Sequence, residues 1–310
     1  MYGRYPSLLP AMLIVGGASL WGLLWLPLRL TEAGGLAGPW VVVATFIFPA
    51  VAVTPLVWLN RRSLRGYGLT VLLFGIFSGA GFAFYTLGLI YTTVVRATLL
   101  FYLTPVWSAI AAWILLKETT HWRGWLAALV GFIGLGFIVG AGGTSVTTIN
   151  LGDGFALVSG LCWAIGVIVL RHRPETPPLF SVSSQYLFAT IIALIFAMLV
   201  AGGQSEGLAD MSSSVGWSQI WNWLSNTAVL GIFSTLVLLP SLFGVFWAAG
   251  RLPPSRVGVL MMSEVLVAIV TASLLTDERM TLIEWVGASL IIAAAVIEVT
   301  ATDENTPERT

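Results

Sequence analysis

Residues 96–118, RATLLFYLTPVWSAIAAWILLKE, and residues 256–278, RVGVLMMSEVLVAIVTASLLTDE, are two versions of one segment, separated by 160 positions without a gap. Each begins with arginine, continues as an apolar run and ends with glutamate. The same register pairs Trp125 with Trp285, and it gives seven identities over 33 positions. The identities are few, but the rare residue types arginine, glutamate and tryptophan coincide, which indicates that the chain contains an internal repeat.

Two further matches extend the repeat toward the N-terminus. The tetrapeptide GIFS at 75–78 recurs at 231–234 with an offset of 156, and Trp21 matches Trp163 at an offset of 142. The change in offset requires 14 extra residues in the later half, and the loop over 202–225 is 15 residues longer than the loop over 60–68. The sequence therefore predicts a first repeat over 1–146, a second repeat over 147–302 and a tail over 303–310.

The composition predicts that both repeats lie in a membrane. Of the 310 residues, 57% are hydrophobic and 9% are charged, whereas a soluble globular chain is about 25% charged. A helix needs roughly 20 apolar residues to cross the hydrocarbon core of a bilayer. Ten runs fit that length, and no strand-like alternation recurs, so an all-α polytopic membrane protein with ten transmembrane helices is expected. The runs lie over 8–28, 39–59, 69–90, 95–116, 122–140, 153–170, 180–201, 226–249, 255–275 and 281–300.

The basic residues predict the orientation of these helices. If the N-terminus lies in the cytoplasm, the cytoplasmic segments hold eleven of the fourteen lysines and arginines. The opposite side keeps only Arg29, Arg96 and Arg279. Because cytoplasmic loops carry an excess of basic residues, this asymmetry favours an N-in, C-in topology.

Five helices per repeat is an odd number, so the second repeat enters the membrane from the opposite side. Such inverted repeats are typical of secondary transporters, in which a substrate site lies near the midplane between the repeats and alternating access moves the substrate. Inverted repeats also occur in channels, so a channel-like or scaffold protein is an alternative.

The segment FYLTPVWSAIAAWILLKE at 101–118, followed by Trp125 and a glycine-rich helix, resembles the EamA domain of the drug/metabolite transporter superfamily. Its second copy runs from Met262 to Trp285, and the Trp21–Gly22 pair fits the same pattern. The second copy has Val265 where the family usually has proline. The resemblance covers nearly the whole chain. It implies a ten-helix basket that exports amino acids or other small metabolites, with the aromatic amino-acid exporters as the nearest functional match.

The resemblance also implies a cavity lined by the first, third, fourth, sixth, eighth and ninth helices. Aromatic rings on those helices are expected to stack on a substrate ring while hydroxyl groups hold its polar end. The chain has 37 aromatic residues, so most of them serve packing or the membrane interface. The substrate-binding candidates are Trp21, Ser78, Phe82, Tyr85, Tyr102, Trp163, Ser234, Ser241, Phe243 and Trp247, with Pro105 and Pro240 as hinges.

Three acidic residues are further candidates. Glu264 lies about nine residues into the ninth run, near the bilayer centre, where an acid costs roughly 2.5–3.5 kcal/mol on insertion scales. It is expected to attract a substrate ammonium, to exchange protons or to cap backbone amides, and the sequence leaves all three roles open. Glu118 and Glu278 end the fourth and ninth helices as gate residues or as solvated charges. Arg96, at the start of the fourth helix, is expected to extend toward lipid headgroups.

Several functions are excluded by what the chain contains. The single cysteine, Cys162, builds no disulfide or cysteine cluster, and no zinc-ligand spacing appears, so neither a cofactor nor a metal is expected. The single lysine, Lys117, follows leucine, so there is no Walker A motif for ATP. A net charge of zero speaks against a nucleic-acid partner. An enzyme is not expected.

The expected partners are a small-molecule substrate and the lipid bilayer, and the expected location is the cell inner membrane. The aromatic candidates and the scarcity of charge at mid-depth favour aromatic or hydrophobic amino acids as cargo. Other amino acids such as threonine and homoserine, drugs and nucleotide sugars are alternatives. Glycines of the fifth helix, such as Gly131 and Gly134, allow close helix packing, either within the fold or in a homodimer.

Overall fold

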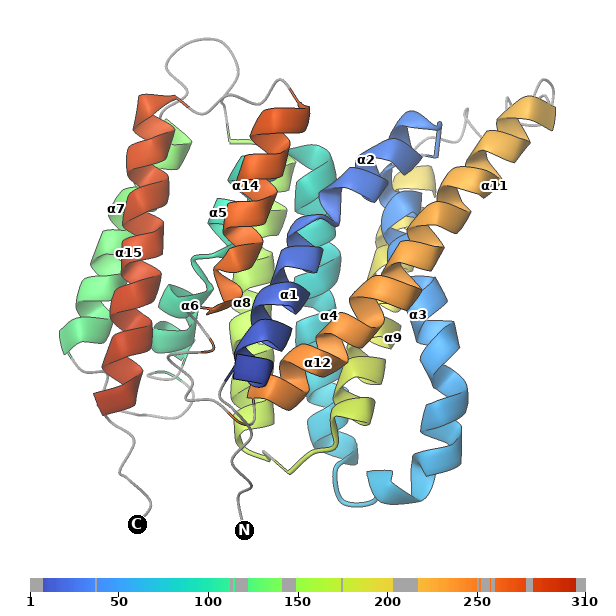
Figure 1. The fold of residues 1–310 in the computed structure, drawn as a ribbon, viewed down its shortest axis with the longest axis horizontal. Helices are drawn as coiled ribbons and strands as arrows, with labels where there is room; N and C mark the ends of the chain where they lie inside the picture. Colours follow the sequence, from blue (N-terminus) through green and yellow to red (C-terminus); the bar gives the residue numbers. More distant parts are fainter. Residues whose placement is uncertain are drawn as a thin grey trace.

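The computed structural model of the chain describes residues 8–36, 38–111, 114, 122–140, 149–173, 175–202, 217–249, 251, 257, 260–276 and 281–304. These residues form helices and their connections, and no strand occurs among them. Figure 1 shows the helices side by side in one bundle, with the start of the first helix and the end of the last helix at the same end. The all-α fold expected from the sequence is confirmed.

In the first half of the chain, the described residues form seven α-helices. They are α1 (Leu8–Gly22), α2 (Trp25–Ala33), α3 (Gly38–Asn60), α4 (Gly68–Tyr91), α5 (Val94–Phe101), α6 (Thr104–Ala111) and α7 (Trp122–Gly140), with the short 3-10 turn η1 (Arg61–Leu64) after α3. The α5 helix begins at a Thr93 N-cap, whose hydroxyl accepts a hydrogen bond from the Arg96 amide.

The second half contains α8 (Leu151–Arg171), α9 (Pro178–Gly202), α11 (Trp217–Ile232), α12 (Leu239–Ala249), α14 (Ser263–Leu275) and α15 (Leu282–Glu304). A π-helical segment, η3 (Phe233–Leu238), joins α11 to α12. The α8 helix starts with a capping box, in which Asn150 and Asp153 exchange side-chain-to-backbone hydrogen bonds. The predicted boundary between the repeats, after residue 146, lies outside the described residues.

Six helical stretches are each long and apolar enough to cross a membrane: Leu8–Ala33, Gly38–Leu59, Gly68–Tyr91, Leu151–Leu170, Pro178–Val200 and Ser225–Ala249. Shorter apolar helices cover Trp125–Gly134, Ser263–Leu275 and Leu282–Ala294. Each of the ten predicted runs overlaps a described helix. The number of crossings and the N-in, C-in orientation stay predictions.

The last helices of the two repeats run in opposite directions. These helices, α7 and α15, pack together. Gly131 of α7 lies beside Ala294 of α15, while Gly134, further along α7, lies beside Gly287 and Ile291, earlier in α15. The two repeat mates therefore run antiparallel.

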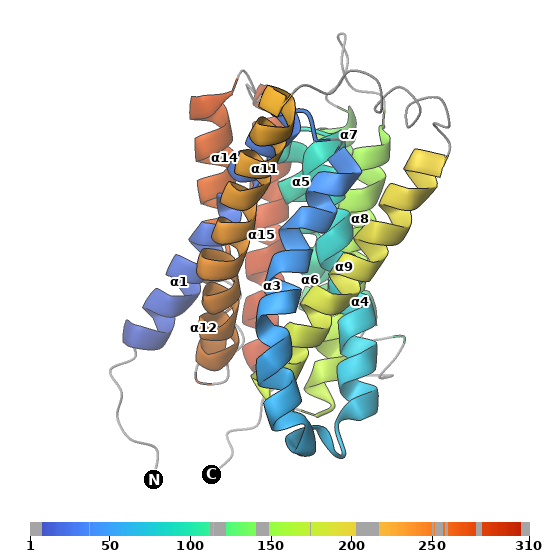
Figure 2. The same cartoon turned by 90° about the vertical axis from the view of Figure 1, so that its right-hand side faces the viewer.

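The first helix of each repeat packs against the other repeat. The α1 helix contacts α12 and α14, and α8 contacts α4, α5 and α6. The second helices of the repeats, α3 and α9, contact each other, and Figure 2 shows them side by side near the viewer. The interface between the repeats thus includes an exchange of their first helices, beside contacts of α7 with α15, of α4 with α9 and of α3 with α9.

The fourth predicted helix is interrupted between α5 and α6, at Tyr102 and Leu103. Pro105 falls in the first turn of α6, where its missing N–H is tolerated, so the break precedes the expected hinge. In the second repeat, α14 begins after a turn at Met262, which is the repeat mate of Tyr102. The two helices break at equivalent positions although Val265 replaces the proline.

The eighth predicted helix also departs from a straight α-helix. Pro240 lies in the first turn of α12 and follows the six-residue π-helical segment η3. Proline has no N–H to donate to the carbonyl group four residues earlier, and a local change of helical pitch accommodates that loss. The first predicted helix is interrupted as well, because α1 ends at Gly22 and α2 begins at Trp25.

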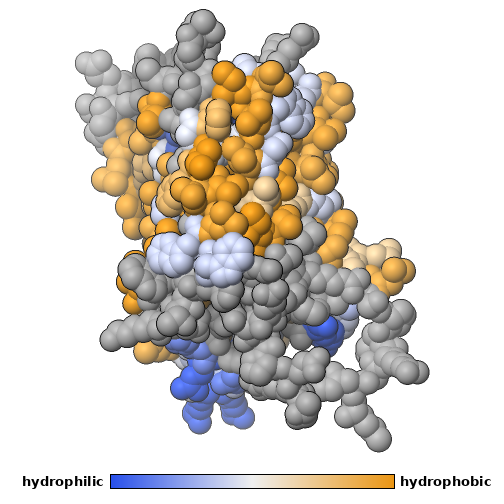
Figure 3. Space-filling view, turned by 90° about the vertical axis from the view of Figure 1, so that its left-hand side faces the viewer, coloured by the Kyte–Doolittle hydropathy of each residue, from blue (hydrophilic) through white to orange (hydrophobic). Residues whose placement is uncertain are grey.

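The outer face of the bundle is apolar. Figure 3, which views the side formed by α7 and α15, shows hydrophobic side chains over the upper part of this face and hydrophilic ones at its lower end. The large exposed hydrophobic residues on these two helices include Leu129, Phe132, Phe137, Ile283 and Val286. Exposing an apolar patch of this extent to water would be unfavourable, whereas contact with lipid acyl chains would bury it.

Candidate functional site

Three aromatic side chains from three helices meet inside the bundle. Phe82 of α4 lies between Trp21 of α1 and Trp163 of α8, with ring centroids 4.7 Å from Trp21 and 5.2 Å from Trp163. The Phe82 and Trp163 rings are stacked, with an interplanar angle of 17°. These separations are typical of favourable aromatic pairs. The two repeat-related tryptophans therefore flank one ring at the contact between the repeats.

Two more rings extend this aromatic cluster toward α3 and α9. The ring of Phe46 in α3 lies 6.4 Å from that of Phe82 and 6.1 Å from that of Tyr186 in α9, measured between centroids. Phe46 and Tyr186 are fully buried. The aromatic cluster is defined here as Trp21, Phe46, Phe82, Trp163 and Tyr186, and its members come from five helices.

Glycines allow the helices that carry these rings to approach closely. A Cβ atom on Gly81 would lie 3.2 Å from both the carbonyl oxygen of Ser159 and the backbone nitrogen of Trp163. A Cβ atom on Gly22 would lie 2.6 Å from the carbonyl oxygen of Glu264. Glycine at these two positions therefore brings α4 against α8 and α1 against α14.

A polar cluster surrounds Glu264, whose side chain lies in the first turn of α14 and is 6% exposed. The Tyr102 hydroxyl lies 3.1 Å from Oε2 of Glu264 and 2.8 Å from the carbonyl oxygen of Met261, and it can donate to either. The Tyr85 hydroxyl interacts with the same carboxyl group and lies 3.3 Å from Oγ1 of Thr98. A carboxylate is favoured at a helix N-terminus because the helix dipole is positive there. This polar cluster connects the helix break at Tyr102 in the first repeat with the helix break at Met262 in the second repeat.

The remaining predicted residues on the third and eighth helices lie apart from these contacts. Ser78 is fully buried, and its backbone faces Gly166 of α8. Ser234 and Ser241 donate to carbonyl oxygens of their own helix, those of Gly231 at 3.2 Å and Leu238 at 2.8 Å.

Phe243 and Trp247 both lie on α12. Phe243 is half-buried and packs against the apolar core. Trp247 lies near the end of the helix, with the Arg251 guanidinium 3.7 Å from its ring centroid. Glu118 and Glu278, the expected gate residues, lie outside the described residues.

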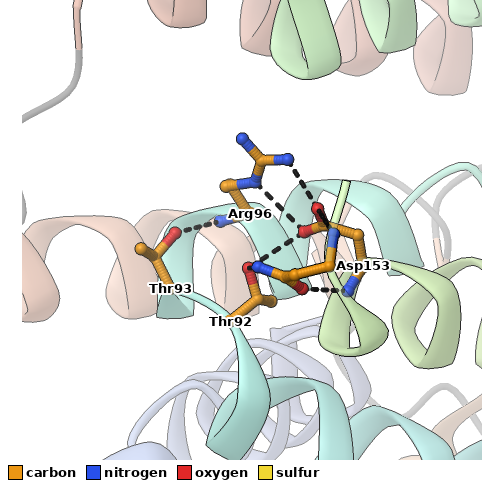
Figure 4. Close-up of polar contacts among 5 residues, drawn as sticks. Thr92, Thr93, Arg96 and Asp153 are labelled. Carbon is orange, nitrogen blue, oxygen red and sulfur yellow. Dashed lines mark hydrogen bonds and ion pairs between the residues drawn. The ribbon is translucent and has the colours of Figure 1, made fainter. Parts of the chain in front are cut away.

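A buried ion pair between the repeats was not predicted from sequence (Figure 4). Arg96 of α5 lies 2.6 Å from Oδ2 of Asp153 through Nη2 and 3.1 Å from Oδ1 through Nε. The Thr92 hydroxyl donates to Oδ1 of Asp153 at 2.9 Å. Arg96 is 3% exposed. The expectation that Arg96 reaches toward headgroups is wrong, because a carboxylate from the other repeat holds it inside the bundle.

Metal binding finds no support in the part of the chain that the structure describes. No group of three or more histidine, cysteine, aspartate or glutamate side chains gathers there in a geometry that could hold a metal ion. The two clusters described above are built from aromatic rings, hydroxyl groups and one carboxyl group, which suit an organic ligand.

Comparison with known families assigns the two halves to one domain type. Residues 8–140 and residues 150–300 each match the EamA-like transporter family. The chain belongs to the EamA-like transporter family. With two EamA repeats and six long apolar helices, it is a multi-pass membrane protein.

Two bacterial relatives carry transporter names. The chain is 25% identical over 216 residues to the uncharacterized transporter sll1164 of Synechocystis sp., covering 66% of this chain and 58% of the relative. It is 27% identical over 179 residues to the uncharacterized transporter YyaM of Bacillus subtilis, covering 56% of this chain and 57% of the relative. The match thus spans little more than half the length of each relative.

A solved structure shares the fold of this EamA protein. That crystal structure matches with a TM-score of 0.57 and 19% sequence identity, over 96% of this chain and 99% of the solved chain. At this level of identity the likeness concerns the fold, and the cargo has to be argued from the site.

The Tyr102–Glu264 contact of this EamA protein gives a testable expectation. We expect Tyr102→Phe to lower the free energy of unfolding by about 1–3 kcal/mol, because it removes a buried hydroxyl that donates to the Glu264 carboxyl group or to the Met261 carbonyl group. Thermal unfolding of purified protein in detergent measures the change. Tyr91→Phe is the matched control, since the Tyr91 ring packs 6.1 Å from that of Phe155 and the substitution keeps this packing. Equal melting temperatures for the two variants would show that the contact contributes nothing.

Proposed function

We propose that this EamA protein is a secondary transporter of the inner membrane that exports small amphipathic metabolites by alternating access, with aromatic or hydrophobic amino acids as cargo. One observation carries the proposal. Trp21 and Trp163 are repeat mates, and they flank the Phe82 ring at the contact between the repeats. Aromatic faces at a repeat interface are suited to an aromatic or apolar side chain.

The packing supports a specific form of alternating access. The hydrogen bond from Trp25 Nε1 to Thr271 Oγ1, at 3.0 Å, fastens the end of the first helix to α14. The Arg96–Asp153 ion pair fastens α8 to α5. We propose that α1, α12 and α14 move as one body and that α4, α5, α6 and α8 move as another. Each moving body then contains helices of both repeats, and the contact of Trp21 with Phe82 lies between the two bodies.

The charges around the clusters support a cargo without phosphate. Among the described residues, Arg96 is the one basic side chain that is buried, and Asp153 neutralises it. A sugar phosphate or nucleotide would need uncommitted basic groups in its site. A zwitterion with an apolar side chain needs none. The Tyr102 contact favours a structural role for Glu264, so facilitated diffusion agrees better with the site than coupling to protons at this residue.

Counterflow in proteoliposomes tests the proposal. Vesicles are loaded with unlabelled tryptophan, phenylalanine, threonine or a nucleotide sugar, and uptake of the matching labelled compound is followed. We expect saturable, transient accumulation for tryptophan and phenylalanine, because exchange through an alternating site drives label against its gradient. Vesicles without protein provide the background.

Each alternative gives a different result. Accumulation of another cargo, with none for aromatic amino acids, would keep the transporter and overturn the proposed substrate. Uptake that neither saturates nor shows counterflow would favour a channel. Absence of uptake across the panel, with folded protein in the vesicles, would favour a scaffold.

A further inference from the structure

The α9 helix carries two buried residues whose polar side-chain atoms have no hydrogen-bond partner among the described residues. Gln185 is fully buried, and neither its Nε2 nor its Oε1 atom has a hydrogen-bond partner among the described residues. The adjacent Tyr186 is 1% exposed, and its hydroxyl likewise has no partner there. On α1, the buried Nε1 atom of Trp21 also has no hydrogen-bond partner among the described residues. Buried polar groups are normally hydrogen-bonded, so each of these requires an explanation.

Two of these groups belong to residues of the aromatic cluster. Tyr186 is a member of it, and Trp21 contacts Phe82 with a centroid separation of 4.7 Å. The backbone of α9 at Gln185 lies directly against Gly79 of α4, because a Cβ atom on Gly79 would be 2.9 Å from the Gln185 carbonyl oxygen. Gly79 is three residues before Phe82 on the same helix. Two of the three unpartnered polar groups therefore belong to residues of the aromatic cluster, and the third belongs to Gln185, the neighbour of Tyr186 on α9.

Three other polar side chains of α9, those of Ser183, Ser184 and Thr190, bond within the helix, whereas the buried Ser181 hydroxyl has no partner among the described residues. Ser183 donates to the Leu179 carbonyl oxygen at 2.5 Å, and Thr190 donates to that of Tyr186 at 2.8 Å. Short hydroxyl side chains reach such carbonyl groups, whereas glutamine and tyrosine at these positions extend beyond them. An apolar residue at 185 would pack in the same space without the cost of burying an amide. A glutamine at this position is explained if a ligand supplies the hydrogen-bond partners of its amide group.

The chemistry of the three groups indicates what that ligand carries. Trp21 Nε1 is a donor only, the Gln185 amide has two N–H donors and one acceptor, and the Tyr186 hydroxyl both donates and accepts. Donors thus outnumber acceptors, and none of the groups is charged. A carboxylate, which accepts at two oxygens, matches this set, and hydrogen bonds to a charged group are stronger than those between neutral groups.

We infer that Gln185 and Tyr186 of α9, together with Trp21, form a carboxylate subsite for the substrate, placed beside the aromatic cluster that holds the substrate side chain. This inference rests on the proposed function and adds a specificity-determining helix to it. The α9 helix is the seventh predicted span, outside the six helices expected to line the cavity.

Gln185→Leu and Tyr186→Phe test the subsite through counterflow with labelled tryptophan. We expect each variant to raise KM about tenfold with little change in maximal rate, as lost hydrogen bonds to a charged group predict. Competition separates the carboxylate from the ring. Unlabelled tryptophan should compete less well in the variants, whereas tryptamine, which lacks the carboxylate, should compete as it does in the unsubstituted protein. Ser183→Ala, on the same helix, should change neither value.

Thermal unfolding in detergent distinguishes binding from a structural role. Without ligand, Gln185→Leu should melt at the same temperature as the unsubstituted protein or higher, because it removes an unpaired buried amide. Saturating tryptophan should then raise the melting temperature of the unsubstituted protein and not that of the variant. An unchanged KM in folded variants, or a marked loss of ligand-free stability in Gln185→Leu, would overturn the subsite while leaving the exporter proposal intact. Failure of counterflow in the unsubstituted protein would overturn both.

Discussion

Replacing Asp153 with alanine should lower the free energy of unfolding by about 3–5 kcal/mol, because it leaves a buried arginine without its counter-charge. Arg96 makes two contacts with the Asp153 carboxylate, at 2.6 and 3.1 Å, and is only 3% exposed. Its guanidinium group cannot lose its charge in response, since arginine stays protonated in proteins. The penalty is increased because Asp153 also accepts a hydrogen bond from Thr92 and caps the start of α8.

Thermal unfolding in detergent and the yield of monodisperse protein measure the effect. An exposed pair provides the control: Arg173 and Glu175 lie 3.8 Å apart, with side chains 57% and 52% exposed. Glu175→Ala should therefore cost less than about 1 kcal/mol. The double variant Arg96→Met/Asp153→Leu should recover much of the lost stability, because it removes both charges together. If Asp153→Ala unfolds at the same temperature as Glu175→Ala, the ion pair is not a structural tie between α5 and α8.

The positions of the helices were predictable because hydrophobic runs report them directly. The run over 122–140 coincides with α7, and the other predicted runs overlap described helices. The breaks within helices were less predictable. Pro105 pointed to a break in the fourth helix, which occurs at Tyr102, but Val265 gave no such signal, and the equivalent helix of the second repeat still breaks at Met262. The contact between Tyr102 and Glu264 joins the two breaks, and contacts of this kind depend on tertiary structure.

The same distinction applies to the candidate site. Trp21 and Trp163 were found because the repeat register pairs two rare residues, and the structure places both on the Phe82 ring. Arg96 and Asp153 are 57 positions apart, each at the end of a predicted span, so nothing in the sequence joined them. Gln185 did leave a signal, since an amide within the apolar run 180–201 is costly to bury. The family resemblance implies a cavity lined by other helices, so Gln185 was not among the predicted substrate-binding residues.

Trp163→Ala should lower kcat/KM for tryptophan counterflow by at least about tenfold, which corresponds to losing an aromatic contact and part of its buried area. Within the aromatic cluster, the Phe82 and Trp163 rings are the pair that lies most nearly parallel. Their centroid separation is 5.2 Å and their interplanar angle is 17°. If a substrate ring packs against these ring faces, the loss in kcat/KM should be greater for tryptophan, which has an aromatic ring, than for leucine, which has none. Measuring both substrates in the same vesicles gives that ratio.

The variant also removes a large, partly buried side chain. Removing a fully buried one costs about 3–5 kcal/mol of stability, so a loss of transport has to be separated from a loss of fold. Trp163→Phe keeps an aromatic face and should recover most of the activity. Trp58→Ala removes a tryptophan that is 63% exposed on α3 and should leave transport unchanged. If Trp163→Ala reduces leucine and tryptophan counterflow by the same factor, or Trp163→Phe fails to restore it in folded protein, ring recognition at this position is wrong. The tryptophan would then serve the packing of α8 on α4.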